Sequence, residues 1–338
     1  MGAAMGAGVG AGGYGAPMRA VQVVDATGPT HLEIRDVAEP TPGPDDVLVE
    51  VHTVGISFPD LLLSRGEYQL KPEPPFTLGV DFAGVVVSGP EGYEPGTRVA
   101  GVGPYGGAAE LVASPAIFTF PVPDEVSFDE AAALPMNYLT AQFALDERGG
   151  LQAGETVLVH GAAGGVGTAT IQVAKGMGAR TIAVVSTEEK AAVARTAGAD
   201  EVVLLDGFKD AVQDLTGGAG VDVVVDVVGG DVFTDSLRLL GAQGRLLVVG
   251  FAAGQGIPQV KVNRLLLNNT DVRGVGWGAY AMSRPGYMHQ QWEKLAPMMA
   301  SGVVKPPVSA TYALEDFGRA LVDMDERRTL GKSVVRMR

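Results

Sequence analysis

The pattern of apolar and polar positions changes near residue 138, and this change divides the chain into two kinds of structure. Before it, short runs of β-branched residues are bounded by proline and glycine, as in residues 18–24 and 46–55. Residues 94–103 and 106–114 give two further strand patterns, and only residues 129–134 look helical. This spacing predicts a compact, β-barrel-like domain.

In the second part of the chain, apolar strands alternate with amphipathic helices. A helix over residues 165–179 should close at Gly178, and one over 187–199 should have Thr187 as its N-cap. Strands of continuous apolar character between helices predict a parallel sheet that is covered on both faces, in a doubly wound Rossmann domain. The expected strands are residues 155–161, 180–186, 201–206, 221–229 and 244–251.

The two ends of the chain complete the predicted organisation. Residues 304–338 return to strand, amphipathic helix and strand, so we expect them to pack on the first domain. A catalytic domain of residues 18–137 and 304–338 would then hold the Rossmann domain, residues 138–303, as an insertion. Residues 1–17 are nearly all glycine and alanine, which predicts a flexible extension.

Composition removes several classes of function. The net charge of −14 argues against nucleic acid or an anionic membrane as the main partner. Without any cysteine there is no disulfide, thiolate zinc site, iron–sulfur cluster or cysteine nucleophile. The four histidines lack metal-ligand spacing, so we expect no metal site. No signal peptide and no apolar run of about 18 residues is present, which favours a cytoplasmic protein.

The turn between the first apolar strand and its helix reads A-x-G-x-x-G, a variant of the dinucleotide fingerprint. In this context the second glycine lets the backbone approach a pyrophosphate, the third lets helix and strand pack closely, and the helix N-terminus faces the phosphates. The alternative is a tight turn with no ligand. We predict cofactor binding by Ala162, Gly164, Gly165, Val166 and Gly167.

The end of the second apolar strand bears on the choice of cofactor. Ser186 stands where NAD-binding domains place an acidic residue for the ribose 2′-hydroxyl, and Lys190 follows one helical turn later. A hydroxyl and a cation accept a 2′-phosphate, so the sequence favours NADPH, with Arg195 as a second candidate cation. The alternative is a solvated Lys190 with Glu188 at the ribose.

The chain resembles the zinc-free quinone oxidoreductase (zeta-crystallin-like) branch of the medium-chain dehydrogenase/reductase superfamily. The similarity covers residues 18–338 and rests on VGISFPDLLLSRGEYQ, PFTLGVDFAGVV, ALPMNYLTA, VLVHGAAGGVGTATIQVAK, NRLLLNNTDVRGVGWGAY and RRTLGKSVV. It implies a GroES-like catalytic domain with an inserted Rossmann domain. At the three positions matching the catalytic zinc ligands of zinc-dependent relatives, this chain has Ser57, Val80 and Met136, which form no zinc site.

The resemblance also implies roles for residues of the early motifs. Tyr68 matches the active-site tyrosine of the similar enoyl thioester reductases and is the first candidate for proton donor; it could instead pack against PEPPF. Ser57 and Asp60 match positions lining the nicotinamide pocket, although Asp60 could equally hold its turn. Asn137 would contact the substrate or cap the next helix, and Thr140 matches a threonine near the nicotinamide.

Further positions follow from the later motifs. Trp277 and Phe58 would stack on a flat acceptor, or else are core or interface aromatics. Arg328 and Lys332 would reach the cofactor phosphates, or else are surface charges. Many quinone reductases have a tyrosine after the third strand, where this chain has Leu205, followed by an unfavourable acidic Asp206. The expected cofactor contacts from these motifs are Val249, Gly250, Phe251, Gly276, Trp277, Arg328 and Lys332.

Taken together, the residues predict an NADPH-dependent reductase of quinones or α,β-unsaturated carbonyl compounds (enones). An enoyl thioester reductase is the alternative enzyme, but it needs a basic rim, and the sequence near Tyr68 offers only Arg65 and Lys71. A non-catalytic NADPH-binding structural or sensor protein is a third possibility. The resemblance further implies a homodimer that pairs the edge strands near residues 270–277.

Overall fold

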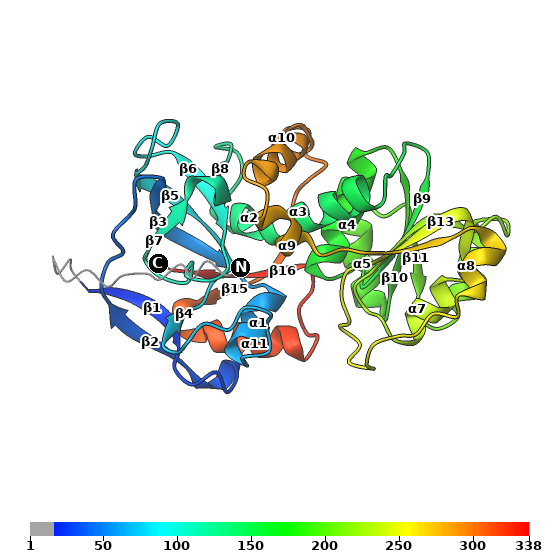
Figure 1. Ribbon diagram of the computed structural model, residues 1–338, viewed down its shortest axis with the longest axis horizontal. Helices are drawn as coiled ribbons and strands as arrows, with labels where there is room; N and C mark the ends of the chain where they lie inside the picture. The colour runs from blue at the N-terminus through cyan, green and yellow to red at the C-terminus, as the bar shows by residue number, and fades with distance from the viewer. Residues whose placement is uncertain (1–16, 338) are drawn as a thin grey trace.

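The computed structural model of the protein describes residues 17–337, and it has two lobes joined by a group of helices (Figure 1). The expected glycine- and alanine-rich extension lies outside this part of the chain except for residue 17. In Figure 1 one lobe is blue, cyan and red, because it combines the two ends of the chain, and the other is green and yellow.

The first lobe is built on a mainly antiparallel sheet of seven strands in the order β15-β16-β3-β5-β6-β8, with β7 paired to β3. Because β15 and β16 come from the end of the chain, the chain returns to this lobe after the second lobe is complete. The strands are β3 (Asp46–Gly55), β5 (Asp81–Ser88), β6 (Arg98–Val102), β7 (Leu111–Pro115), β8 (Thr119–Pro121), β15 (Val308–Ala313) and β16 (Lys332–Arg336).

A smaller sheet and three helices complete this lobe. The sheet has the order β2-β1-β4, and Ala20 of β1 forms a bridge to Ala109 near the larger sheet. The elements are β1 (Met18–Val23), β2 (Leu32–Val37), β4 (Phe76–Thr77), α1 (Phe58–Ser64), α2 (Phe128–Ala133) and α11 (Phe317–Asp325). Alternate side chains of β3 are buried along its first eight residues, as expected of a strand with one face on a core.

The second lobe is a six-stranded parallel sheet in the order β11-β10-β9-β12-β13-β14. This order confirms the predicted Rossmann-type domain, and it reverses between β9 and β12, where ligands bind outside the carboxyl ends of the strands. The elements are β9 (Thr156–His160), α4 (Gly165–Gly176), β10 (Arg180–Val185), α5 (Glu188–Thr196), β11 (Glu201–Leu204), α6 (Phe208–Leu215), β12 (Val221–Asp226), α7 (Asp231–Ser236), β13 (Leu240–Val248), α8 (Asn263–Asn268) and β14 (Asp271–Gly274).

The predicted local signals of this lobe are present. Thr187 is the N-cap of α5, where its hydroxyl accepts a hydrogen bond from the backbone N–H of Lys190 at 3.3 Å. Gly178 has a φ of 80°. Helix α4 ends at Gly176, two residues before this glycine. The left-handed conformation explains why glycine stops this helix.

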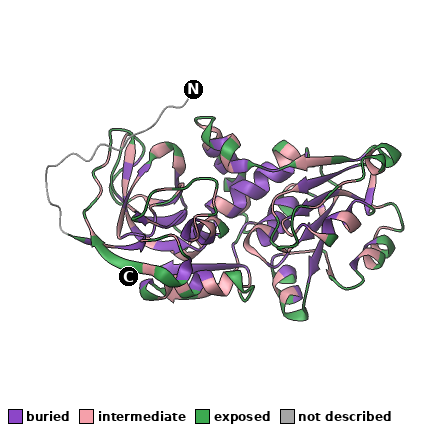
Figure 2. Ribbon diagram, turned by 60° about the horizontal axis from the view of Figure 1, so that its bottom comes forward, coloured by how far each residue is buried: buried purple, intermediate pink, exposed green. Residues whose placement is uncertain are grey.

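Four helical segments connect the lobes: α3 (Pro135–Gln142), the π-helix η3 (Phe143–Arg148), α9 (Trp277–Met282) and α10 (Tyr287–Ala300). Helix α3 packs against α4 of the second lobe and against α2 and β6 of the first, and α10 packs on α3. The central strands and α3 are buried, whereas β2 is exposed over most of its length (Figure 2). Within residues 17–337, no helix is long and apolar enough to cross a membrane.

His160, at the end of β9, makes folding sensitive to acid. Its imidazole is buried, its Nε2 lies 2.6 Å from the Ser236 hydroxyl, and burial lowers its pKa from 6.5 to about 3. Between these values only the unfolded chain binds the proton, so the stability that the neutral imidazole contributes is lost as the pH falls below 6.5. We expect about 2 kcal/mol of this loss between pH 7 and pH 5.

Urea unfolding at pH 7 and pH 5 measures this effect. The His160→Gln variant should show the smaller decline, because it has no proton to bind. If the variant and the wild type lose the same unfolding free energy between the two pH values, His160 is not the acid-sensitive group.

Candidate functional site

The glycine turn after β9 has the shape that a dinucleotide pyrophosphate requires. A Cβ atom on Gly167 would lie 2.2 Å from the carbonyl oxygen of Gly161, so only glycine lets α4 approach the strand this closely. A Cβ on Gly164 would meet only the Gly161 oxygen, at 3.4 Å, which leaves space above the turn. The first turn of α4 has no acidic residue and no side-chain cap, so its N–H groups suit a phosphate.

Asn137 lies directly against this turn. It is buried on α3, and a Cβ on Gly165 would lie 2.4 Å from its Nδ2 atom. A side chain at position 165 would therefore force the Asn137 amide to move. Thr140 is one helical turn further along α3 and is also buried. The structure thus places both residues at the junction between the lobes, on the helix that contacts α4.

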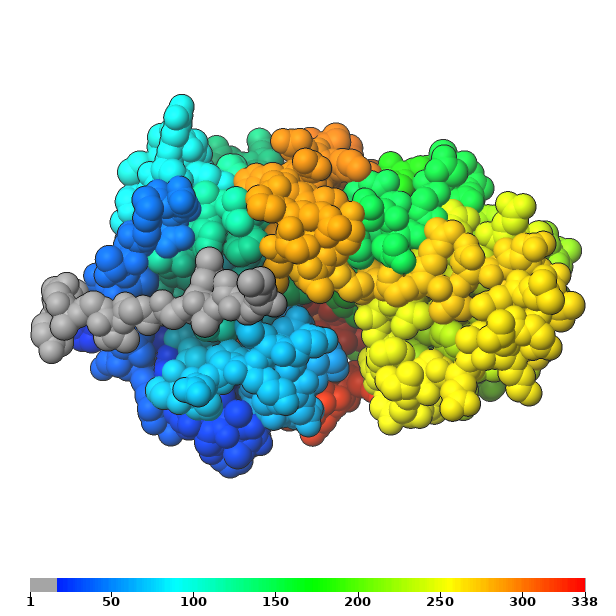
Figure 3. Space-filling view, viewed as in Figure 1, coloured from blue at the N-terminus to red at the C-terminus, as the bar shows by residue number. Residues whose placement is uncertain are grey.

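The segment before β16 reaches the Rossmann lobe at two places. Gly331 forms a bridge to Gly164, and its N–H donates to the Ala163 carbonyl at 2.7 Å. The Arg327 guanidinium donates to the carbonyl of Ala252, beyond β13, at 2.8 Å. In the space-filling view this segment, in red, is visible between the two lobes (Figure 3). Part of RRTLGK is therefore next to the glycine turn.

A buried polar cluster lies beneath this junction, in the first lobe. The Lys332 ammonium donates to the Ser57 hydroxyl at 2.6 Å and to Oδ2 of Asp81 at 2.8 Å, and the Ser57 hydroxyl donates to the same Oδ2 at 2.6 Å. The side chains of Lys332 and Asp81 are only 4% and 0% exposed. Oδ1 of Asp81 accepts the N–H of Met136, near the start of α3, at 2.8 Å.

Lys332 is thus not the surface charge that the sequence left open. Because its ammonium is buried against Asp81, it does not extend from the surface toward phosphates either, and its predicted cofactor contact is replaced by this internal role. Sequence reasoning missed Asp81 altogether. Its only signal was an acidic residue inside the apolar run PFTLGVDFAGVV.

Asp60 holds the turn at the start of α1. Its Oδ1 accepts the N–H groups of Gly79 and Val80 at 3.1 Å each, and its Oδ2 accepts the N–H of Ser57 at 3.1 Å. Burial, and then the negative charge of Asp81, raises its pKa to about 7 against the effect of these donors. Since Asp60 is fully buried and holds backbone groups, the structure favours the structural interpretation over a catalytic one.

Tyr68 lies beside this cluster on the loop that follows α1. It is partly buried against the core, and burial, followed by the negative charge of Asp60, raises the pKa of its hydroxyl above the ordinary value. The hydroxyl is protonated across the neutral range, as a tyrosine already is at its ordinary pKa. A protonated phenol can donate a hydrogen bond to a developing oxyanion.

Ser186 and Lys190 come together at the end of β10, as the NADPH prediction requires. The Lys190 ammonium donates to the Ser186 hydroxyl at 3.2 Å on the exposed surface. Arg195 is instead within 3.8 Å of Glu188, so this second candidate is paired on its own helix. The Leu205 N–H donates to the Val185 carbonyl at 2.7 Å, which places Leu205 next to the same strand end.

The carboxyl end of β13 is tied to that of β12. The N–H groups of Val249 and Gly250 donate to the carbonyl of Asp226, at 2.8 and 3.4 Å. Oδ1 of Asp226 accepts the N–H groups of Val228 and Gly229, at 2.8 and 2.9 Å. Asp226, which the sequence did not single out, thus shapes both loops at the expected cofactor edge.

The aromatic residues divide between surface and core. Phe251 and Phe58 are exposed, whereas Trp277 is buried and donates through Nε1 to the Gln291 side chain at 2.8 Å. This position corrects the expectation that Trp277 stacks on an acceptor, and it favours the core alternative. Gly276, the N-cap of α9, has open space where a Cβ would lie.

Arg328 is exposed and forms ion pairs with Asp323 and Glu326. The structure therefore gives this guanidinium acidic neighbours, and the hydrogen bonds and ion pairs of its side chain go to these carboxylates rather than to the glycine turn.

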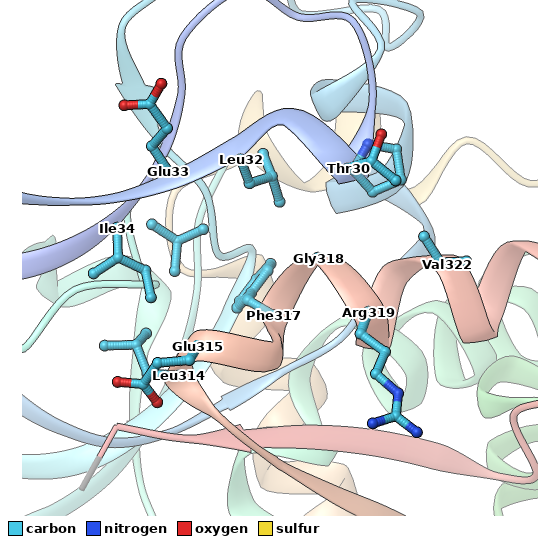
Figure 4. Close-up of a pocket in the computed structure, with 12 residues that line it drawn as sticks. Thr30, Leu32, Glu33, Ile34, Leu314, Glu315, Phe317, Gly318, Arg319 and Val322 are labelled. Carbon is cyan, nitrogen blue, oxygen red and sulfur yellow. The ribbon is translucent and has the colours of Figure 1, made fainter.

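A separate groove of about 400 Å³ lies between β2 and α11 in the first lobe (Figure 4). It is lined by apolar side chains such as Leu32, Ile34 and Phe317, together with Glu33 and Arg319. None of its lining residues belongs to the glycine turn or to the cluster of Ser57, Asp81 and Lys332. The groove is therefore separate from the glycine turn and from this cluster.

The site does not fit a metal ion. No group of three histidine, aspartate or glutamate residues within residues 17–337 is placed to hold one. Ser57, Val80 and Met136 are poor ligands, and the nearby carboxylate of Asp81 is already bound to an ammonium ion. A second cation beside Lys332 would be repelled.

Comparisons with known proteins agree with this architecture. Residues 43–124 match the family "Alcohol dehydrogenase GroES-like domain", and residues 165–301 match "Zinc-binding dehydrogenase". "Quinone oxidoreductase-like protein 2" of Rattus norvegicus is 39% identical over 313 residues, which cover 91% of this chain and 89% of the rat protein. The chain belongs to the quinone oxidoreductase branch of the medium-chain dehydrogenase/reductase superfamily. It is therefore an oxidoreductase that binds a nicotinamide cofactor.

Two solved structures have folds closely similar to that of this chain. A probable oxidoreductase from Mycobacterium abscessus superposes with a TM-score of 0.87 at 45% identity, over 96% of this chain and 100% of that one. A mycobacterial protein complexed with NADPH superposes with a TM-score of 0.85 at 33% identity, over 94% of this chain and 99% of the other.

Proposed function

We propose that the protein is an NADPH-dependent reductase that transfers hydride to a quinone or an enone without zinc. The observation that carries this proposal is the buried cluster next to the cofactor turn. Lys332, Ser57 and Asp81 satisfy one another there, so a buried ion pair, and not a set of metal ligands, lies at this place. An acceptor in this cleft must therefore be electrophilic before it binds.

Bound NADPH supplies the hydride in this reaction class. The chain positions the acceptor and stabilises the charge that develops on its carbonyl oxygen. We assign this role to the Tyr68 hydroxyl, which is protonated at neutral pH and can donate a hydrogen bond and then the proton. Asn137 holds the cofactor side of the cleft, because its amide packs on the middle of the glycine turn.

The loss of absorbance at 340 nm, as NADPH is consumed, tests this function. The acceptors are 1,4-benzoquinone, an enone such as methyl vinyl ketone, and crotonyl-CoA, each with an enzyme-free control. We expect turnover with the quinone or the enone. NADPH binding without turnover of any acceptor would favour the structural or sensor alternative.

The thioester alternative finds little support near the cleft. A coenzyme A or carrier phosphate needs free cations at the rim, but Arg65 is already paired with Asp325. Lys71 is then the one remaining cation of the two that the sequence offers near Tyr68. Turnover of crotonyl-CoA well above that of the simple enone would nevertheless establish this alternative.

The cofactor preference follows from the Ser186–Lys190 pair. In our proposal the 2′-phosphate of NADPH accepts hydrogen bonds from both this hydroxyl and this ammonium, which the structure brings together at one strand end, 3.2 Å apart. Replacing Lys190 with alanine should weaken NADPH binding about tenfold and leave NADH binding nearly unchanged. Fluorescence titration gives both Kd values.

Arg195→Ala is the matched control for Lys190→Ala. Arg195 lies on the same helix but is paired with Glu188, so its loss should change neither Kd. Equal weakening of NADPH and NADH in the Lys190 variant would remove the assignment of the 2′-phosphate site.

We also propose that a second copy of the chain covers the outer edge of the Rossmann lobe. Strand β14 is the edge of its sheet, and the adjacent helix α8 exposes Leu266 and Leu267 by 77% and 74%. Light scattering with size-exclusion chromatography should give twice the 34.8 kDa chain mass. The double change Leu266→Glu with Leu267→Glu should halve it; a wild-type monomer would refute the dimer.

A further inference from the structure

The buried cluster around Lys332 joins four segments that are far apart in the sequence. Ser57 is the N-cap of α1, Asp81 begins β5, Met136 lies in the first turn of α3, and Lys332 begins β16. All four meet through hydrogen bonds of 2.6 to 2.8 Å to the Asp81 carboxylate or the Lys332 ammonium. Three of these segments belong to the first lobe, and α3 leads into the second.

Lys332 of this cluster directly follows a residue that contacts the cofactor turn. Gly331, which precedes Lys332, donates its N–H to Ala163 and bridges Gly164. On the other side, α3 carries Asn137, whose amide packs on Gly165. The position of the Lys332 ammonium therefore bears on two of the chain segments that flank the phosphate turn.

We propose that Lys332 is a positioning residue that fixes α1, which leads into the Tyr68 loop, and the cofactor turn relative to each other, by bonding to Ser57 and Asp81 at the junction of the two lobes. The inference deepens the proposed function, since it assigns the organisation of that same cleft to an internal ammonium ion.

The energetics of buried ion pairs suggest a comparison of a single with a double substitution. Removing one partner leaves an uncompensated buried charge, whereas neutral replacement of both partners often costs little. Lys332→Met should therefore lower the unfolding temperature. In the double variant Lys332→Met with Asp81→Asn, the amide introduced by the second change can still bond Ser57 and the Met136 N–H, so much of the unfolding temperature should return.

The double variant distinguishes a role of Lys332 in positioning the site from a role in stabilising the fold alone. If Lys332 positions the cleft, the double variant should keep a tenfold or greater loss of kcat, because Ser57 and α3 are no longer tied to β16. Its Kd for NADPH, measured by fluorescence titration, should rise several-fold because Gly331 loses its anchor. A double variant with wild-type kcat and wild-type Kd would show that the pair only stabilises the fold, and one that fails to fold would overturn the proposal equally.

Arg245 provides a matched control. Its guanidinium forms a mostly buried ion pair with Glu155 at 2.5 Å, and it also bonds Gly149 beyond the π-helix, away from the glycine turn. Arg245→Met should lower the unfolding temperature and leave kcat and the NADPH Kd of the folded protein unchanged. If the wild type turns over no acceptor, the proposed function fails, while the NADPH Kd still tests the role of Lys332.

Discussion

Replacing Tyr68 with phenylalanine is expected to lower kcat with an enone acceptor by about a hundredfold, while the Kd for NADPH changes little. The phenol is partly buried beside Asp60, and burial, followed by that negative charge, raises the pKa of its hydroxyl further above neutral pH, where a tyrosine is already protonated. Hydride addition leaves negative charge on the acceptor oxygen, and without the hydroxyl that charge has lost its donor. Steady-state kinetics at saturating NADPH measure the effect.

Tyr312 provides the control for this change. Burial, followed by its hydrogen bond to Asp323, raises its pKa to about 12, but it lies on the edge strand β15 rather than beside the cleft. The Tyr312→Phe variant should keep its kcat. If Tyr68→Phe also keeps the wild-type kcat, solvent or another group donates the proton, and the assignment of Tyr68 fails.

Replacing Gly167 with alanine should have the second large effect, this time on cofactor binding. The new Cβ would lie 2.2 Å from the Gly161 carbonyl oxygen and 2.7 Å from the Cα of Ala162, and both neighbours are backbone atoms that cannot rotate away. The start of α4 must then shift, which should cost about 2 kcal/mol of unfolding free energy. Because the shift moves the N–H groups that face the phosphates, NADPH binding should weaken tenfold or more.

Gly278 is the matched glycine, since it also lies within a helix, α9, and has nothing within 4 Å of the position of its Cβ. Gly278→Ala should leave NADPH binding unchanged and stabilise the helix slightly. Urea unfolding and fluorescence titration on both variants give the comparison. A Gly167→Ala variant with the wild-type Kd would mean that this turn does not hold the cofactor.

The parts of the fold that the sequence predicts best are those governed by local periodicity. The strands of the Rossmann lobe are nearly continuous apolar runs, and Thr187 and Gly178 delimit the helices next to them, so the observed elements agree with the predicted ones. Strand β5 was not predicted as a strand. Its buried residues follow Gly79 and include the acidic Asp81, which is buried only because a residue 251 positions away neutralises it.

In the candidate site, too, local sequence patterns did not predict burial that depends on partners far away in the sequence. Local pattern identified the glycine turn, and family likeness directed attention to Tyr68, but neither could assign Lys332 or Trp277 correctly. A lysine near the end of a chain is usually solvated, and a tryptophan can stack or pack. The burial of these two side chains depends on partners from other segments, Asp81 and Gln291, and only the tertiary structure brings them together.

The most direct test of the account is the rate of NADPH oxidation by protein that has been treated with a chelator and shown by metal analysis to contain no zinc. The rate is followed at 340 nm with 1,4-benzoquinone and with an enone, before and after treatment. The account predicts the same turnover in both preparations. Turnover that disappears with the metal and returns when zinc is added would contradict a cleft organised by Lys332, Ser57 and Asp81.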